Sequence, residues 1–242
     1  MQTFHRGTYE ARLAVSGNEV HAACQLRARA FGLQTAVDRD AFDTDCQHVL
    51  ISDRRTDALV ACFRLLRFDG RKIQTSYCAQ FYDLSLLEHH PGCMAEIGRF
   101  CVDPDLSDPD ILRVAWAALT RLVDDHQIEF LFGCASFPGT DADPYRDAFA
   151  LLQHTYLGPK HWLPRVKSPQ VVRFDATSRL SPNKKRALQN IPSLLRTYLM
   201  MGGWVSDHAV IDPHMNTLHV FTGLEVAHIP AVRKRLLRAV SR

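Results

Sequence analysis

The stretch EIGRFCVDPDLSDPDILRVAWAALTRLVDDHQIEFLFGCA, residues 96–135, decides the fold class of this chain. Residues 96–102 predict a strand, which ends at the loop 103–109, rich in proline and aspartate. Apolar residues at helical spacing predict a helix over 110–126, and the apolar run 128–135 predicts a strand that is covered on both faces. A strand, a crossover helix and a second strand in succession favour parallel pairing, so we expect an α/β fold.

Weaker patterns on either side extend this unit. They predict helices over 18–31 and 194–201 and strands over 48–52, 59–66, 209–211 and 218–221. Residues 158–192 contain five prolines and little periodicity, which predicts an extended, mobile excursion. Because no internal repeat or low-complexity segment occurs, we expect a single domain over 1–242, with an extended basic region over 158–242.

The composition is that of a protein with a real core, since 46% of the 242 residues are apolar. Its longest apolar stretches are interrupted by charges such as Arg113 and Arg121, and they fall short of the roughly 20 apolar residues that a bilayer crossing needs. The N-terminal segment lacks the pattern of an export signal, and seven widely spaced cysteines fit a reduced compartment. We therefore predict a cytoplasmic protein, with peripheral contact to the inner membrane as an open alternative.

Positive charge is concentrated near the C-terminal end of the chain. Residues 159–200 carry nine basic side chains and one acidic side chain, and residues 231–242 carry five basic and none acidic. A surface of this kind attracts an acidic protein, an anionic lipid leaflet or a nucleic acid. Aromatic residues are too sparse among the basic ones to favour nucleic acid, so no nucleic-acid partner is predicted.

The most chemically suggestive residues are Glu96 and Arg99. Residues three apart in a regular strand point to opposite faces, so the two side chains are not automatically an ion pair. A carboxylate buried at the centre of a sheet can have a raised pKa and serve as a general base. Glu96 is therefore our candidate base.

Other residues give weaker indications of a catalytic nucleophile, a metal site or a nucleotide-binding loop. Cys134 and Ser136 stand where a strand ends in small residues, but the sequence offers no recognisable supporting histidine and acid and no nucleophile-elbow pattern. His89 and His90 with Cys93 do not provide four ligands at zinc-like spacing, so no metal site is predicted. A glycine-rich phosphate loop is absent, which argues against a nucleotide-binding enzyme.

Three segments carry a family resemblance: AEIGRFCVDP (95–104), LFGCASFPGTD (131–141) and IPSLLRTYLMMGGWVSDHAVIDPHMNTLHV (191–220). Together they resemble the ornithine N-alpha-acyltransferases of bacterial ornithine-lipid synthesis, relatives of acyl-homoserine-lactone synthases within the acetyltransferase superfamily. The resemblance implies a mixed central sheet, splayed at the acyl site, with helices on both faces. It also implies transfer of a 3-hydroxyacyl group from an acyl carrier protein to the α-amine of ornithine, which gives a lyso-ornithine lipid.

The resemblance also assigns candidate site residues. Motif by motif, the functional cluster of the lactone-synthase relatives falls on Arg27, Phe31, Asp43, Arg64, Glu96 and Arg99, with Asp45 as an addition. Glu96 and Arg99 are expected to be catalytic. The other five are expected to bind substrate, together with Cys134, Ser136 and Asn216.

The donor is expected to be the acyl-phosphopantetheine of the carrier protein, with no other cofactor. Members of the superfamily that use coenzyme A have a glycine-rich pyrophosphate loop after this strand, whereas this chain has DPDLSDPD over 103–110. Its carboxylates would repel a pyrophosphate. Direct attack of the amine on the thioester would then need a base and no enzyme nucleophile.

Two departures from the family pattern leave the acceptor open. The run Asn216-Thr217-Leu218-His219 replaces an expected asparagine-threonine-threonine-aspartate, and His208 replaces a usual glycine. Loss of a carboxylate would weaken selection for a cationic side chain, so glutamine or another amino acid is an alternative acceptor. An acyl-homoserine-lactone synthase is a second alternative, although its expected tryptophan is missing from residues 34–37. A basic membrane-associated binding protein is the non-enzymatic alternative.

Overall fold

A computed structural model describes residues 1–175 and 182–240. Two of the basic side chains counted above, Arg179 and Arg242, lie outside the described residues. The described chain divides into two compact units, a first unit of Met1–Arg67, Ile97–Ile128 and Ala231–Arg242 and a second unit of Phe68–Glu96 and Glu129–Pro230. That these units form a single domain stays a prediction.

The first unit is built on an antiparallel set of strands. Its strands are β1 (Phe4–Arg6), β2 (Tyr9–Leu13), β3 (Gln47–Asp53), β4 (Ala58–Phe68) and most of β6 (Met94–Val102), in the spatial order β1-β2-β3-β4-β6. The pairs β1–β2, β2–β3 and β3–β4 are antiparallel. The predicted strands over 48–52 and 59–66 are confirmed as β3 and β4, and each is longer than expected.

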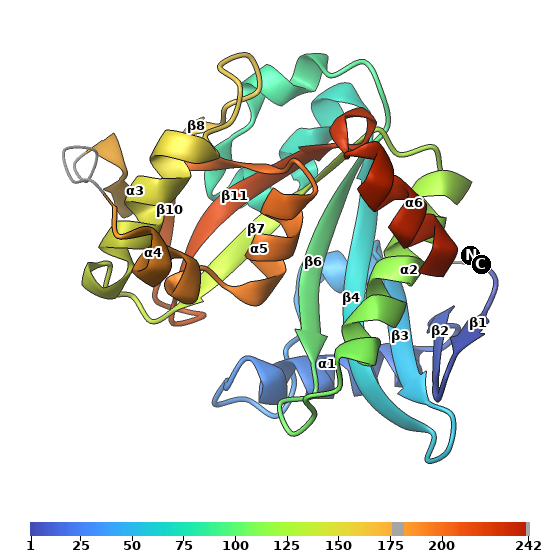
Figure 1. Ribbon diagram of the computed structural model, residues 1–242. Helices are drawn as coiled ribbons and strands as arrows, with labels where there is room; N and C mark the ends of the chain where they lie inside the picture. Colours follow the sequence, from blue (N-terminus) through green and yellow to red (C-terminus); the bar gives the residue numbers. More distant parts are fainter. Residues whose placement is uncertain (176–181, 241–242) are drawn as a thin grey trace. The chain divides into compact units, whose positions relative to one another are not determined.

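Helices α1 (Gly17–Ala30) and α2 (Pro109–Asp125) lie on opposite faces of this sheet. Cys62 packs with Leu26 of α1, whereas the next residue, Phe63, stacks on Phe100, which contacts Trp116 of α2. Neighbouring strand residues point to opposite faces, so the two helices cover different faces. Helix α6 (Ala231–Val240) runs beside α2 (Figure 1), and Arg238 of α6 forms an ion pair with an aspartate near the C-terminal end of α2.

The second unit contains the parallel pair. The first residues of β6 pair in parallel with β7 (Phe130–Pro138) through Met94–Phe130, Ala95–Leu131 and Glu96–Phe132, as the sequence predicts. The order continues through β11 (Thr217–Glu225), β10 (Trp204–Asp212) and β9 (Val171–Arg173), all antiparallel. The short strands β5 (Tyr82–Asp83) and β8 (Arg165–Val166) form a separate pair.

One face of β7, β11 and β10 is covered by α3 (Arg146–Thr155), α4 (Lys184–Asn190) and α5 (Ser193–Met200) (Figure 1). Phe137, Leu218 and Val220 pack under these helices, and Ala135 packs against the same cluster. Cys134 is next to Ala135 in β7 and therefore points to the opposite face. His219 and Phe221 flank Val220 and therefore point to the opposite face, where Tyr82 of β5 meets both of them.

Short 3-10 helices connect these elements. They are η1 (Ala41–Thr44), η2 (Gly70–Thr75), η3 (Cys78–Gln80), η4 (Ser85–His89), η5 (Asp143–Tyr145) and η7 (Val226–His228). The prediction of an extended excursion over 158–192 was wrong in part, because this segment contributes β8, β9 and α4. Each is so short that it carries no readable periodicity, and β9 is held as an edge strand by pairing with β10. No helix within the described ranges is long and apolar enough to span a bilayer.

Candidate active site

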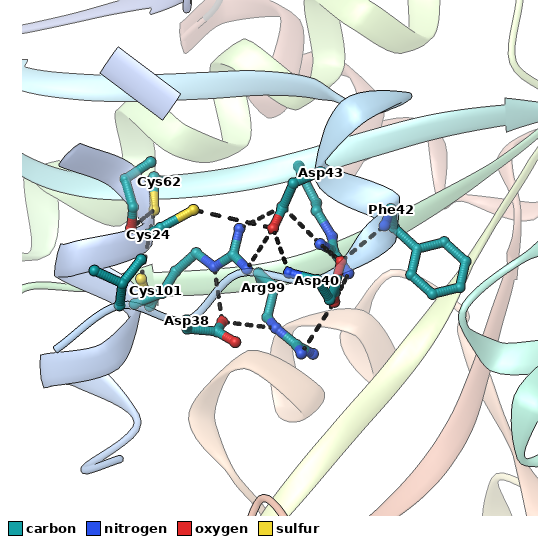
Figure 2. Close-up of polar contacts among 12 residues, drawn as sticks. Cys24, Asp38, Asp40, Phe42, Asp43, Cys62, Arg99 and Cys101 are labelled. Atoms are coloured by element: carbon teal, nitrogen blue, oxygen red, sulfur yellow. Dashed lines mark hydrogen bonds and ion pairs between the residues drawn. The ribbon is translucent and has the colours of Figure 1, made fainter. Parts of the chain in front are cut away.

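A closed ring of charged side chains lies in the first unit. Three arginines and three aspartates alternate around it, in the order Arg27, Asp43, Arg64, Asp40, Arg99 and Asp38 (Figure 2). Asp43 accepts from Arg27 and Arg64 at N–O distances of 2.6 and 2.7 Å. Asp40 accepts from Arg64 at 2.6 Å and from Arg99 at 3.2 Å. Asp38 closes the ring by accepting from the Nε atoms of Arg27 and Arg99, both at 2.8 Å.

The ring joins four separate parts of the first unit. Arg27 comes from α1, Arg64 from β4 and Arg99 from β6, and the aspartates come from residues 38–43, which include η1. Residue 40 caps η1: the Asp40 carboxylate accepts from the N–H of Phe42, and Asp43 accepts from the N–H of Asp40 at 2.9 Å. This reciprocal capping fixes the segment in the shape that presents its carboxylates to the arginines.

Two aspartates of the ring, Asp43 and Asp40, have pKa values below the ordinary value. Burial acts to raise the pKa of Asp43, but hydrogen bonds from Arg27 and from the backbone outweigh burial and hold that pKa well below its ordinary value. The pKa of Asp40 is also lowered, because Arg64 outweighs the effect of burial. Three positive and three negative charges cancel, and only Asp40 and Arg99 keep appreciable exposure, with side chains 23% and 12% exposed. These two residues are therefore the ring members that solvent reaches most.

Arg99 reaches the ring through an unusual backbone conformation. Its φ is 53°, in the left-handed region that residues with a side chain seldom adopt. A Cβ at the preceding Gly98 would lie 3.3 Å from Nε of Arg64, so a larger residue there would press on the Arg64 side chain. The local departure from regular strand geometry interrupts the simple alternation of faces that the sequence analysis assumed for Glu96 and Arg99.

Glu96 lies in the second unit among neutral donors. Its carboxylate accepts the backbone N–H of Tyr77 at 2.9 Å and that of Cys78 at 2.7 Å, where the chain enters η3. The residue is 6% exposed. Burial raises the pKa of Glu96 to about 6, while hydrogen bonds from Cys78 and Tyr77 oppose that rise. A carboxylate with this pKa can hold or release a proton near neutral pH.

Two thiols lie near this carboxylate, and a histidine lies near one of them. Sγ of Cys78 lies 3.4 Å from Sγ of Cys134 on β7. His219 pairs with Ser136 across β7 and β11, which places its imidazole on the same face as Cys134. Burial acts to lower the pKa of His219, but the Cys134 sulfur outweighs it, and the pKa lies above its ordinary value.

Tyr82 lies between two buried histidines. Its hydroxyl contacts Nδ1 of His219 at 3.1 Å and donates to the His219 carbonyl at 2.8 Å, and its ring packs against His208, 5.2 Å between centroids. Nε2 of each histidine is buried and lacks a hydrogen-bond partner within the part of the chain that the structure describes. Both histidines stand at positions where the sequence departs from the family pattern, and both belong to one aromatic cluster.

The other predicted site residues that the structure describes are neither members of the ring nor hydrogen-bond partners of Glu96, although Ser136 pairs with His219 across the sheet. Phe31 caps the C-terminal end of α1 and packs on the apolar residues beneath that helix. Asp45 and Ser136 are exposed. Asn216 is an exposed turn residue between β10 and β11, with φ 49°, and its carbonyl accepts the N–H of Gly139.

Sequence reasoning missed Asp38, Asp40, Cys78 and Tyr82. The aspartate-rich composition of residues 38–46 was visible, but it did not tell which carboxylates meet an arginine. Cys78 and Tyr82 carry no motif, because their part in the site depends on a backbone N–H and on packing against strands more than 50 residues away.

Comparisons with known proteins agree with this fold. The family described as Acetyltransferase (GNAT) domain matches residues 22–117. The loading GNATL domain of CurA from Lyngbya majuscula is 11% identical with a TM-score of 0.51, over 92% of this chain and 100% of that chain. The mixed sheet with helices on both faces thus has an acetyltransferase-like fold.

Relatives with higher sequence identity show the family to which the chain belongs. The L-ornithine N(alpha)-acyltransferase of Rhodobacter capsulatus is 34% identical over 88% of each chain. That of Agrobacterium fabrum is 30% identical over 92% of this chain and 83% of its own. The chain therefore belongs to the L-ornithine N(alpha)-acyltransferase family, and the resemblance predicted from three sequence segments is confirmed.

Proposed function

We propose that this chain acylates the α-amine of ornithine, with Glu96 as the base that collects the amine proton. The observation that carries the proposal is the buried Glu96 carboxylate, whose donors are neutral and whose pKa is about 6. A base works best when its pKa lies near the working pH. The names of the relatives supply the acceptor.

The chemistry needs one proton acceptor and donors for one oxyanion. An α-ammonium group, with a pKa on the order of 8, must lose a proton before its nitrogen can attack a thioester carbonyl. Glu96 takes that proton directly or through water. The C–N bond forms, the tetrahedral oxyanion is held by backbone N–H groups, and the C–S bond then breaks to release the carrier thiol.

We assign the donor to an acyl carrier protein because the start of α2 is already occupied by carboxylates. A helix N-terminus is where an anion such as a pyrophosphate would bind. Here Asp108 caps α2 by accepting the N–H of Asp110, and Asp110 adds a negative charge to the first turn. The exposed cations Lys184, Lys185 and Arg186 of α4 offer a surface for an acidic carrier protein.

One experiment tests the reaction and the base together. Purified protein is incubated with a 3-hydroxyacyl carrier protein and each common amino acid, and products are identified by mass spectrometry. We expect N-acyl ornithine as the main product, and a loss of about 10²- to 10⁴-fold in turnover for Glu96→Gln. Asp53→Asn is the matched control, since Asp53 is also a buried carboxylate that accepts a backbone N–H.

Each outcome of that experiment bears on a separate part of the proposal. Full turnover in a folded Glu96→Gln protein would remove Glu96 from the mechanism. A product formed from glutamine and not from ornithine would favour glutamine as the acceptor. The buried His219 in place of an expected aspartate supports this alternative. Equal turnover with acyl-coenzyme A would argue against the carrier protein.

We also propose that α6 contacts the surface of an anionic membrane. Val232 and Leu236, one helical turn apart, are 66% and 55% exposed, and Arg233 and Arg235 beside them are exposed cations. An apolar stripe flanked by cations is typical of a helix that lies in a lipid interface. The expected result is binding to phosphatidylglycerol vesicles that weakens in Val232→Ser/Leu236→Ser, whereas equal binding to neutral vesicles would contradict an anionic partner.

A further inference from the structure

The Cys78 and Cys134 thiols form a contact pair beside Glu96. Their sulfur atoms are 3.4 Å apart, and neither belongs to a disulfide. A disulfide bond needs the sulfur atoms at about 2 Å, so the pair must close by little more than an ångström. The two cysteines are 56 residues apart in the chain, so η3 and β7 bring them together.

The two thiols differ in access. Cys78 is fully buried, and burial raises the pKa of its thiol. Cys134 is partly exposed. Nε2 of His219, on the same sheet face, has no hydrogen-bond partner of normal geometry among the residues that the structure describes, so it can accept the Cys134 proton. Cys134 is therefore the thiol that an oxidant reaches, and His219 is the group that helps it to ionise.

We propose that Cys78 and Cys134 form a reversible disulfide when hydrogen peroxide oxidises this chain. In the first step the Cys134 sulfur attacks the peroxide, giving a sulfenic acid and water. In the second step the Cys78 sulfur attacks the sulfenic sulfur, the S–S bond forms and a second water leaves. Two electrons pass from the two sulfur atoms to the peroxide, and a dithiol reverses the bond by exchange.

Proximity makes the second step feasible although Cys78 is a poorly ionised thiol. A buried thiol with a raised pKa is a weak nucleophile toward a reagent in solution. Here its partner sulfur is already in contact, and holding two reactants together can replace a very high concentration of one of them. Further oxidation of Cys134 then competes with ring closure by a neighbour at 3.4 Å.

The disulfide would act on the carboxylate. The Cys78 thiol donates toward Glu96 and its backbone N–H donates at 2.7 Å, so one residue supplies two of the donors that hold the base. A disulfide removes the thiol donor and ties η3 to β7. The resulting loss of turnover rests on the proposed function of Glu96, whereas formation of the disulfide does not.

A second thiol pair provides an internal control. Sγ of Cys62 lies 3.6 Å from Sγ of Cys101 in the first unit, nearly the separation of the Cys78–Cys134 pair. Both members are buried, 2% and 6% exposed, so an oxidant has poor access to either. Proximity alone predicts that both pairs oxidise, and access predicts that only Cys78–Cys134 does.

The experiment treats the purified full-length chain with hydrogen peroxide and maps its peptides by mass spectrometry. We expect a linked peptide containing residues 78 and 134, lighter by two hydrogens than its parts. We also expect a loss of turnover of about tenfold or more, the order that follows from losing one hydrogen bond to a charged group, and recovery with dithiothreitol. Cys134→Ser and Cys78→Ser should give no such peptide, whereas Cys101→Ser should still give it.

The linked peptide is measured without substrate, which separates this proposal from the proposed function. A Cys62–Cys101 link in place of Cys78–Cys134, or Cys134 converted to sulfinic acid with no link, would overturn the proposal. If the link forms and turnover is unchanged, the tuning of Glu96 by Cys78 is wrong. An untreated protein that acylates no amine would contradict the proposed function and leave the mapped disulfide standing.

Discussion

Asp43 and Glu96 are both buried carboxylates, but their neighbours differ in charge. Asp43 in the first unit accepts hydrogen bonds from two guanidinium groups, and its pKa is held well below the ordinary value. Glu96 in the second unit accepts from two backbone N–H groups, and burial raises its pKa to about 6. Positive partners keep a carboxylate permanently charged, which suits a structural link. Neutral partners leave it able to exchange a proton, which suits a base.

The largest expected effect comes from breaking the ring. Asp43→Ala leaves Arg27 and Arg64 buried without a shared acceptor, so we expect the free energy of unfolding to fall by about 3–5 kcal/mol. Urea unfolding of the variant and the parent measures this difference. Asp45→Ala, an exposed aspartate two residues away, should change stability by about 0.5 kcal/mol or less. Similar costs for the two variants would show that the ring is not a structural link.

A smaller effect should appear in the pH dependence of stability. The pKa of Glu96 is raised in the folded state from 4.5 to about 6, so its contribution is present below the unfolded value and is lost as pH rises through the folded value. The loss should amount to about 2 kcal/mol between about pH 4 and about pH 7. Asp40 and Asp43 of the ring have lowered pKa values, so their contribution is lost in the other direction, as pH falls.

Comparison with Glu96→Gln isolates the contribution of Glu96 to the pH dependence of stability. The difference in unfolding free energy between parent and variant should change by the stated amount across this range, since other titrating groups cancel. A difference that stays constant with pH would mean that Glu96 has an ordinary pKa in the folded protein.

The pH dependence of turnover should give a further, slightly smaller effect. Below a pH of about 6 Glu96 is protonated and cannot accept the amine proton. We expect the ratio of parent to Glu96→Gln turnover to fall by up to about tenfold for each pH unit below that value. Using the ratio removes the titration of the substrate amine, which affects both proteins equally. A ratio that is level from acid to neutral pH would contradict a base with this pKa.

The smallest effect is expected for an exposed ion pair of the same residue types. Arg238 of α6 meets Asp124 of α2 at 2.8 Å, with side chains 54% and 44% exposed. Solvent screens such a pair, so Arg238→Ala should change the free energy of unfolding by about 0–1 kcal/mol. Urea unfolding beside the Asp43→Ala measurement checks this, and a loss as large as that of the buried ring would remove burial as the cause of the contrast.

Much of the architecture was predictable because it depends on local pattern. The parallel unit followed from a strand, a periodic helix and a second strand, and Glu96 lies on the first of these strands, as the sequence predicts. Its role as a base stays a prediction. The resemblance named four members of the ring as candidates, and the structure brings them together. They are Arg27, Asp43, Arg64 and Arg99. Their roles toward a substrate stay predictions.

Other features could not be predicted because they depend on contacts across long separations. An arginine has five donors, and nothing local tells which of the aspartates in 38–46 will meet them. Arg99 reaches Asp38 and Asp40 only because its backbone takes a left-handed conformation. Cys78 serves the site through its backbone N–H, which every residue other than proline possesses, so the sequence carries no signal for it.

The sequence by itself determined the alternation of strands and helices, the acidic start of α2 and the presence of an acid on β6, because periodicity and capping act between near neighbours. Only the tertiary structure decided which buried acid is permanently charged and which can titrate. That distinction depends on whether a guanidinium or a neutral N–H is placed within hydrogen-bond distance, and residues far apart in the chain supply those groups.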